Sequence, residues 1–445
     1  MLPWTPLLLP LLLSLAFPSP ATQSPLPTLP AYPTRLADLK RADAGPRFDR
    51  ATRALLSPAE IQFSAALGHR RDTEARALRL IESFPPAMPF AAGRDIMRRS
   101  EVYALLESMP KGAVLHSHSA AAVGLGWMVQ EAVRLGDSWI RLAGWGLGKV
   151  ASRKLAGRVP GMHEVAPGTW MPEFRFSRSR PDGDPHWDPL DAVRSAYPGG
   201  AAAFDKAVEF NVSILSSHPE IDYPTDKTAW VKFARCFPVI GSLIGYLPLL
   251  RSQFRHIFEI SLADSTTLIE LRWVPNTTYD ITGRVYTVAE TVDALHDVAE
   301  AFKAERPEFG GFGLIPSLFR AADVKVVEAQ LRQMVELRVG REDWIVGVDL
   351  VGEEILAPLS VLVPSVLSTQ QYAHTLNTTL PLFLHAGETL LAGPAPDENL
   401  YDALLLGARR IGHGISLARH PALIDLIIKE EIAVEVCLIS NSMLR

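Results

Sequence analysis

Residues Ala113-Val-Leu-His-Ser-His118 form an apolar run that ends in two histidines, and they give the strongest indication of the fold of this chain. Two more fragments end apolar runs in a similar way, His385-Ala-Gly-Glu388 and Gly412-His-Gly414. Histidines at positions i and i+2 of a strand point the same way, since side chains alternate with period two, so both can reach one metal ion. Histidines from further strand ends can join them where parallel strands converge at the mouth of a barrel. The three fragments together predict a metal site at the carboxyl ends of parallel strands.

Apolar segments alternate with helical ones over the second part of the chain. We predict strands at 113–118, 267–273, 311–316, 344–350, 380–385, 410–413 and 432–437. Helical patterns lie between them, for example at 288–306, 324–337, 399–408 and 422–429. This alternation indicates a parallel α/β sheet. Histidines at the strand ends favour a TIM (β/α)8-type barrel over a doubly wound sheet, because that barrel keeps its site there.

The first 21 residues are typical of a secretory signal peptide, although they lack a positively charged start. Their apolar run is too short to span a bilayer and is followed by the small residues Ser19 and Ala21. We therefore expect a secreted protein that begins near Thr22, with no membrane span. Three sequons would then be N-glycosylation acceptors, those of Asn211, Asn276 and Asn377.

Residues 22–108 form a predicted N-terminal helical module ahead of the barrel, which occupies 109–445. Helical periodicity appears at 59–69, 72–83 and 93–108, and Ser57-Pro-Ala-Glu60 is a capping-box start. About 150 residues separate the first two barrel strands, and the part from about 136 to 200 has little periodicity, so we predict an insertion there.

The composition argues against nucleic acid as a partner and leaves one disulfide bond possible. A net charge of −5 offers no basic face for nucleic acid. The two cysteines, Cys236 and Cys437, are too few for a disulfide framework, although one bridge between them stays open.

Several motifs resemble those of the adenosine deaminase family, and more closely its secreted branch, the adenosine-deaminase-related growth factors. The resemblance runs from about Ala59 to Arg445. The motifs that carry it are Met109-Pro-Lys-Gly-Ala-Val-Leu-His116, Val348-Asp-Leu-Val-Gly352, Phe383-Leu-His-Ala-Gly-Glu-Thr389, Arg410-Ile-Gly-His-Gly414 and Val434-Glu-Val-Cys-Leu-Ile-Ser-Asn441. It implies a zinc-dependent hydrolysis of adenosine or 2'-deoxyadenosine, and a homodimer formed through the N-terminal helices. The helical pattern alone fits a helical cap on the barrel equally well.

The resemblance also implies a role for each site residue. His116, His118 and His385 are expected to bind zinc, which with an open position makes a water nucleophilic near neutral pH. Glu388 is expected to donate a proton to the purine, and His413 to act as the base that orients the water. The expected substrate contacts come from Gly352, Trp230 and Glu220.

The sequence departs from the family pattern at several points. Ser119 stands where the secreted branch has an aspartate, Phe319 where a histidine precedes Arg320, and Glu353 where a histidine is common. The pattern next requires a helix and an eighth strand with adjacent aspartates, and the sequence stops before them, so we expect a C-terminally truncated chain whose barrel lacks strand eight. Two interpretations stay open: a secreted adenosine deaminase, or a catalytically impaired, growth-factor-like binding relative.

Overall fold

The computed structural model describes residues 30–44, 50–144, 170–216, 218–389 and 391–444, so the predicted signal peptide at 1–21 lies outside the described residues. The chain divides into two compact units, Met1–Thr73 and Glu74–Arg445. Among the described residues, no helix is long and apolar enough to cross a bilayer.

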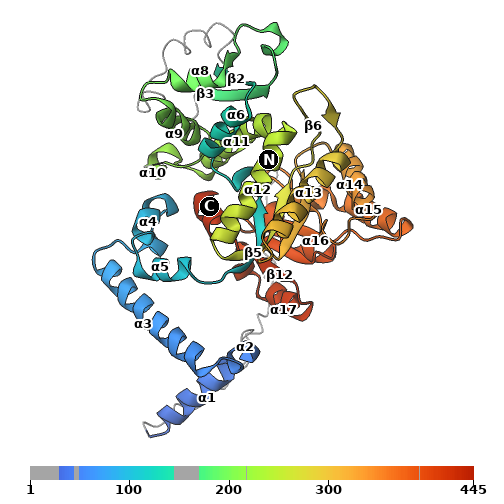
Figure 1. Ribbon diagram of the computed structural model, residues 1–445. Helices are drawn as coiled ribbons and strands as arrows, with labels where there is room; N and C mark the ends of the chain where they lie inside the picture. The colour runs from blue at the N-terminus through green and yellow to red at the C-terminus, as the bar shows by residue number, and fades with distance from the viewer. Residues whose placement is uncertain (1–29, 45–49, 145–169, 217, 390, 445) are drawn as a thin grey trace, which may run out of the picture. The chain divides into compact units, whose positions relative to one another are not determined.

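The first unit is helical (Figure 1). It contains α1 (Tyr32–Ala44), α2 (Arg50–Ala54) and most of α3 (Pro58–Leu80). The predicted capping box is present at the start of α3: the Ser57 backbone N–H donates to Glu60 Oε2 at 2.7 Å, and the Glu60 N–H donates to Ser57 Oγ at 3.3 Å. The sequence predicted two helices where the structure has one, because residues 69–72 contain no helix breaker.

The second unit is built on seven parallel strands. In order across the sheet they are β1 (Gly112–His118), β5 (Thr266–Trp273), β8 (Gly311–Phe319), β9 (Asp349–Val351), β10 (Phe383–Ala386), β11 (Arg410–His413) and β12 (Ala433–Glu435). A parallel bridge between Val348 and Leu382 joins the first four strands to the last three. Because spatial order follows chain order without the reversal of a doubly wound sheet, this is the sheet of a (β/α)8-type barrel. The predicted fold class is confirmed.

Helices alternate with these strands along the chain, as in a (β/α)8 barrel. They are α12 (Leu247–Ala263), α13 (Val288–Glu305), α14 (Val324–Arg338), α15 (Val363–Thr375), α16 (Ala395–Leu405), α17 (Pro421–Lys429) and α18 (Leu438–Leu444). Thr287 and Glu290 form the capping box that starts α13. The fourth strand is shorter than its predicted range of 344–350, with only single bridges at Ile345 and Val348 before β9 begins.

Helices α4 (Phe90–Met97) and α5 (Glu101–Glu107) precede β1. They replace the single helix predicted at 93–108, because the Ser100 side chain accepts from the Tyr103 N–H and so begins a new helix.

An antiparallel sheet lies in the predicted insertion. After α6 (Leu125–Leu135), β2 (Ser138–Gly144) pairs with both β3 (Trp170–Phe176) and β4 (Asp188–Pro189), while residues 145–169 lie outside the described residues. Strand β3 packs on α9 (Ala201–Asn211) and α11 (Asp226–Ile244), as Figure 1 shows. Phe174 and Phe176 of β3 are buried in the main core. The segment is therefore part of the folded unit, which its weak periodicity did not indicate.

Candidate active site

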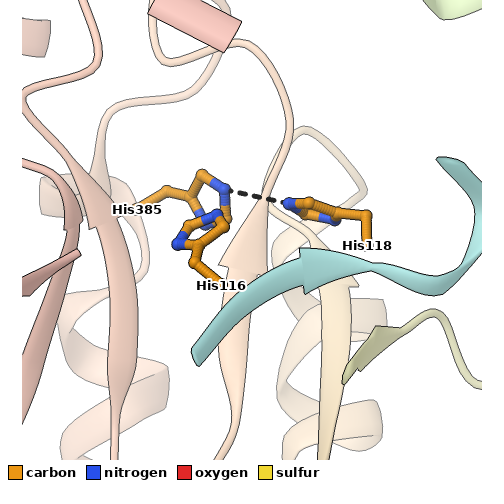
Figure 2. Close-up of side chains that lie close together, drawn as sticks. All are labelled: His116, His118 and His385. Atoms are coloured by element: carbon orange, nitrogen blue, oxygen red, sulfur yellow. Dashed lines mark hydrogen bonds between the residues drawn. The ribbon is translucent and has the colours of Figure 1, made fainter. Parts of the chain in front are cut away.

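Four histidines meet at the carboxyl ends of three strands. His116 and His118 lie at the end of β1, His385 on β10 and His413 at the end of β11. Ring centroids of His116 and His385 are 4.7 Å apart, and those of His385 and His413 are 5.0 Å apart. Figure 2 shows the rings of His116, His118 and His385 facing one another. The three fragments recognised in the sequence therefore do converge.

Carboxylates hold two of these rings in one tautomer. His385 Nδ1 lies 2.7 Å from Asp349 Oδ2, and His116 Nδ1 lies 2.9 Å from Glu435 Oε2. A carboxylate only accepts, so each Nδ1 carries the proton and each Nε2 keeps its lone pair. Both rings thus present Nε2 as a ligand atom, which is the usual state of a metal-binding histidine.

One arginine joins the two carboxylates. Arg272 of β5 donates from Nε to Asp349 Oδ2 and from Nη2 to Glu435 Oε2, each at 2.6 Å, and its side chain is fully buried. Burial opposes ionisation of Asp349, but the neighbouring His385 and Arg272 outweigh it and hold its pKa well below the ordinary value. Burial likewise opposes ionisation of Glu435, yet the hydrogen bond from His116 and the charge of Arg272 keep its pKa low. Both carboxylates are therefore ionised at neutral pH.

The histidine nitrogens fit a tetrahedral metal ion. Ligand atoms of His116, His118 and His385 all lie within 4.8 Å of one another, and the Nε2 atoms of His118 and His385 are 3.3 Å apart. Metal–nitrogen bonds of about 2.0–2.1 Å in tetrahedral geometry separate two ligand atoms by about 3.3–3.4 Å. Burial lowers the pKa of His118 to about 3 and that of His385 well below its ordinary value, so both rings are neutral donors. The set can hold a metal cofactor.

Glu388 and His413 form a second pair beside the metal-ligand set. His413 Nε2 is 3.4 Å from Glu388 Oε1, and both side chains are buried. Burial and the nearby Glu354 carboxylate raise the pKa of Glu388 to about 8, whereas burial lowers that of His413 to about 3. At neutral pH the carboxyl is therefore protonated and the imidazole is neutral, which gives an acid and a base side by side.

Asn441 connects this pair. His413 Nδ1 lies 3.2 Å from Asn441 Oδ1, and Asn441 Nδ2 donates to the Glu388 carbonyl at 2.9 Å. The asparagine therefore places the proton of His413 on Nδ1 and leaves Nε2 free to accept one. Asn441 had no predicted role, although it closes the last motif quoted above.

The expected substrate contacts are placed less clearly. Gly352 follows β9 with a φ of +112°, a conformation that favours glycine. Trp230 of α11 is buried and clusters with Ala229 and Leu444, so its packing is that of a core residue. Glu220 lies in α10 (Pro219–Asp222), and its side chain is outside the described residues. The structure thus brings together the histidines and Glu388, and it places Trp230 in a separate packing cluster.

The departures from the family pattern lie near the same strand ends. Ser119 is buried just after β1, and its carbonyl accepts from Gln253 Nε2 at 2.9 Å. Phe319 at the end of β8 is 46 % exposed and lies next to Gly352.

Sequence reasoning missed Arg272, Asp349 and Glu435. A usable signal was present for Asp349 and Glu435, because each is a charged residue in an otherwise apolar segment predicted as a parallel strand, where both faces are normally covered. Arg272 gave a weaker signal, since its strand also contains Glu270. The pairing itself was hidden, since Arg272 is 77 residues from Asp349 and 163 from Glu435.

Comparison with known proteins agrees with this geometry. Residues 212–445 match the family described as adenosine deaminase, which is more than half of the chain. The chain belongs to the adenosine deaminase family. It is 30 % identical to adenosine deaminase 2 of Pongo abelii over 402 residues, which cover 88 % of this chain and 72 % of that protein. Adenosine deaminase 2 of Homo sapiens is 30 % identical over 371 residues, 81 % of this chain and 66 % of that one.

Similarity to a solved structure is weaker. The Arabidopsis ADAL structure complexed with GMP has a TM-score of 0.44 and 17 % identity, over 77 % of this chain and 75 % of that one. As a member of the adenosine deaminase family, the chain is a hydrolytic deaminase.

Proposed function

We propose that the protein is a secreted, zinc-dependent adenosine deaminase that converts adenosine or 2'-deoxyadenosine and water into the inosine product and ammonia. The observation that carries the proposal is the convergence of three neutral histidines beside a protonated carboxyl, Glu388. Names of the relatives support the substrate class, because those proteins are called adenosine deaminases.

Zinc is the metal that the donor set supports. It binds imidazole nitrogen in tetrahedral sites and keeps one position open when it is catalytic. When bound by His116, His118 and His385, the ion supplies Lewis acidity that makes water nucleophilic at neutral pH. The chain's own part is to hold two of these rings by Asp349 and Glu435 so that Nε2 faces the ion.

Glu388 and His413 perform the proton transfers. Attack of water on purine C6 pushes electrons onto N1, and the protonated Glu388 donates its proton there. Neutral His413 accepts a proton from the water through Nε2, because its Nδ1 is occupied by Asn441. His413 then passes this proton to the amino group, which leaves C6 as ammonia. The C6 hydroxyl returns a proton to Glu388 as the carbonyl of the product forms. Gly352 is proposed to meet the purine with its backbone, and Trp230 and Glu220 to contact the nucleoside.

The alternative, a catalytically impaired binding relative, is not favoured. His116, His118, His385, Glu388 and His413 all keep both their identity and a mutually consistent geometry. Loss of function relaxes such constraints, and no such relaxation is visible among these five residues.

The test measures zinc and turnover on the same samples. Wild-type protein should contain about one zinc per chain, shown by elemental analysis, and should reduce the absorbance of adenosine. His385→Ala should lose both properties, while His374→Ala, at an exposed histidine of α15, should lose neither. A wild type that turns over adenosine without any bound metal would contradict the proposal.

Secretion is a separate part of the proposal, supported by the apolar leader and the sequons. Asn377 is exposed in a turn, so it is the best-placed acceptor. Asn211 is only 7 % exposed, and its Nδ2 donates to the Ala207 carbonyl at 2.8 Å, which leaves no room for a glycan. Mass spectrometry of the culture medium should find a chain that starts near Thr22; a cytosolic protein with Met1 intact would contradict this.

Homodimerisation through the module at 22–108 is also proposed. Exposed apolar side chains on its helices support it, namely Leu36, Leu39, Ile61 and Phe63. Analytical ultracentrifugation should give twice the chain mass, and a variant with Leu39 and Phe63 replaced by serine should sediment as a monomer.

A further inference from the structure

Glu354 is a fully buried carboxylate that the proposed chemistry does not use. It lies just beyond β9 and accepts through Oε2 from the backbone N–H groups of Glu388 at 2.9 Å and Thr389 at 3.4 Å. Its other oxygen accepts from Asn399 Nδ2 at 3.1 Å, and Asn399 is also fully buried. Every contact of this carboxylate is therefore made inside the protein.

Arg320 holds the same segment at its other end. Its Nη2 donates to the His385 carbonyl at 2.6 Å and to the Leu350 carbonyl at 2.8 Å. Its Nη1 makes no hydrogen bond and lies 3.8 Å from Glu354 Oε1, so the arginine and the glutamate form a buried ion pair. Arg320 thus donates to the carbonyl of His385, the proposed metal ligand, and Glu354 accepts from the backbone N–H of Glu388, the proposed acid.

The turn from His385 to Glu388, which lies between these two contacts, is conformationally restricted. Gly387 adopts a φ of +69°, and a Cβ at this position would come within 2.6 Å of Ser416 Oγ and 3.0 Å of Leu400 Cδ2. The turn is thus closely packed on its outer side, while its ends are tied to Arg320 and Glu354. The distance from metal ligand to acid is consequently set by the backbone and not by the Glu388 side chain alone.

We propose that Glu354, paired with Arg320, is a positioning residue that holds the His385–Glu388 turn by its backbone and so places the Glu388 carboxyl against His413. The inference rests on the proposed deaminase function and adds two residues that act through Glu388 without touching substrate. Asn399 completes the arrangement, because its Oδ1 accepts from the Leu359 N–H at 2.7 Å and therefore keeps its Nδ2 aimed at Glu354.

Two variants distinguish the positioning of the His385–Glu388 turn by Glu354 from a contribution of Glu354 to overall folding. Glu354→Ala removes the acceptor of two backbone amides. The double variant E354Q/N399D rebuilds the hydrogen bonds to the backbone and moves the negative charge near Arg320 from position 354 to position 399. The new side-chain amide at position 354 accepts from the backbone through its oxygen and donates to the new carboxylate at position 399, which accepts from Leu359 as before. Glu354→Gln alone sets two amide donors against each other and serves as the milder variant where the alanine chain does not fold. Glu300→Gln, at an exposed glutamate of α13, is the matched control.

Three measurements read the outcome. E354A should lower kcat by about 10–100-fold, since a displacement near 1 Å can cost that much, with KM within about threefold of wild type and zinc content unchanged. Amide hydrogen exchange of Glu388 and Thr389 should become at least about tenfold faster, which is measured without any substrate. E354Q/N399D should recover both kcat and exchange protection to within about threefold of wild type.

Unchanged exchange at Glu388 in E354A would overturn the inference, whatever the activity. A double variant with wild-type exchange and thermal stability but a persistently low kcat would also overturn it, because the backbone hold would then be insufficient. A wild type without deaminase activity would instead count against the proposed function, and the exchange data would still decide the role of Glu354.

Discussion

Replacing Asp349 by asparagine should damage the metal site and the fold in amounts that the structure allows us to work out. Asp349 has no exposed surface and accepts four hydrogen bonds: two from the backbone N–H groups of Leu350 and His385, one from His385 Nδ1 and one from Arg272 Nε. The asparagine oxygen can keep the two backbone bonds. Its amide group then faces two donors, so both side-chain bonds are lost.

Two costs follow from that loss. A hydrogen bond to a charged group contributes about 1.5–3 kcal/mol, so losing two, with Arg272 left half-paired, should lower the free energy of unfolding by about 3–5 kcal/mol. His385 can regain a bond only by moving its proton to Nε2, so that Nδ1 accepts from the asparagine NH2 group; the protonated Nε2 would then face the metal. Losing such a carboxylate typically lowers metal affinity about 10–100-fold.

The assay pairs urea unfolding of the metal-free protein with zinc titration against a competing chelator. Asp205→Asn is the control, because Asp205 on α9 is buried and takes two hydrogen bonds from Arg194, at 2.7 and 2.8 Å. It should lower stability and leave zinc affinity within about threefold of wild type. The reasoning fails if D349N binds zinc as tightly as wild type, or if D205N weakens binding equally.

Three further outcomes are expected. Glu388→Gln should reduce kcat by about 10²–10⁴-fold and retain zinc, because an amide cannot deliver the proton; near-normal turnover would make Glu388 structural. In the wild type, kcat should fall as the pH rises through about 8, since the raised pKa keeps the Glu388 carboxyl protonated below that pH and the acid is lost above it, whereas a flat profile from pH 7 to 10 would contradict the assignment. Peptide mapping of secreted protein should find glycan at Asn377 and not at Asn211, and an occupied Asn211 in folded protein would refute the burial argument.

The sequence predicted the strands that carry histidines because their signal is local. An apolar run that ends in His116-Ser-His118 or in His385 specifies both the strand and the direction of the side chain, so order and site could be inferred together. The sheet of the insertion could not, because β2 pairs with β3 across residues 145–169 and the alternation is confined to the short run Glu173-Phe-Arg-Phe176. Helix ends were misplaced where a cap such as Ser100 divides one periodic run into two helices.

The residues that support the site from behind could not be predicted from the sequence for a different reason. Glu354 looks like one of two glutamates in a loop after β9, and nothing local distinguishes it from Glu353. Its role depends on the amide of Glu388, 34 residues away, and on Asn399, 45 residues away. A role defined by partners that meet only after folding cannot be read from one sequence.

The position of Arg272 shows that intact metal-ligand histidines are not enough to infer that a relative is active. A descendant that replaced Arg272 alone would keep every histidine, yet the carboxylates behind His116 and His385 would both lose their common partner. A comparison of motifs alone would classify such a protein as an active enzyme, although its affinity for the metal would be reduced. Surveys that sort working deaminases from pseudoenzymes should therefore score Arg272, Asp349 and Glu435 as one unit. The three should covary across the family even though they are far apart along the chain.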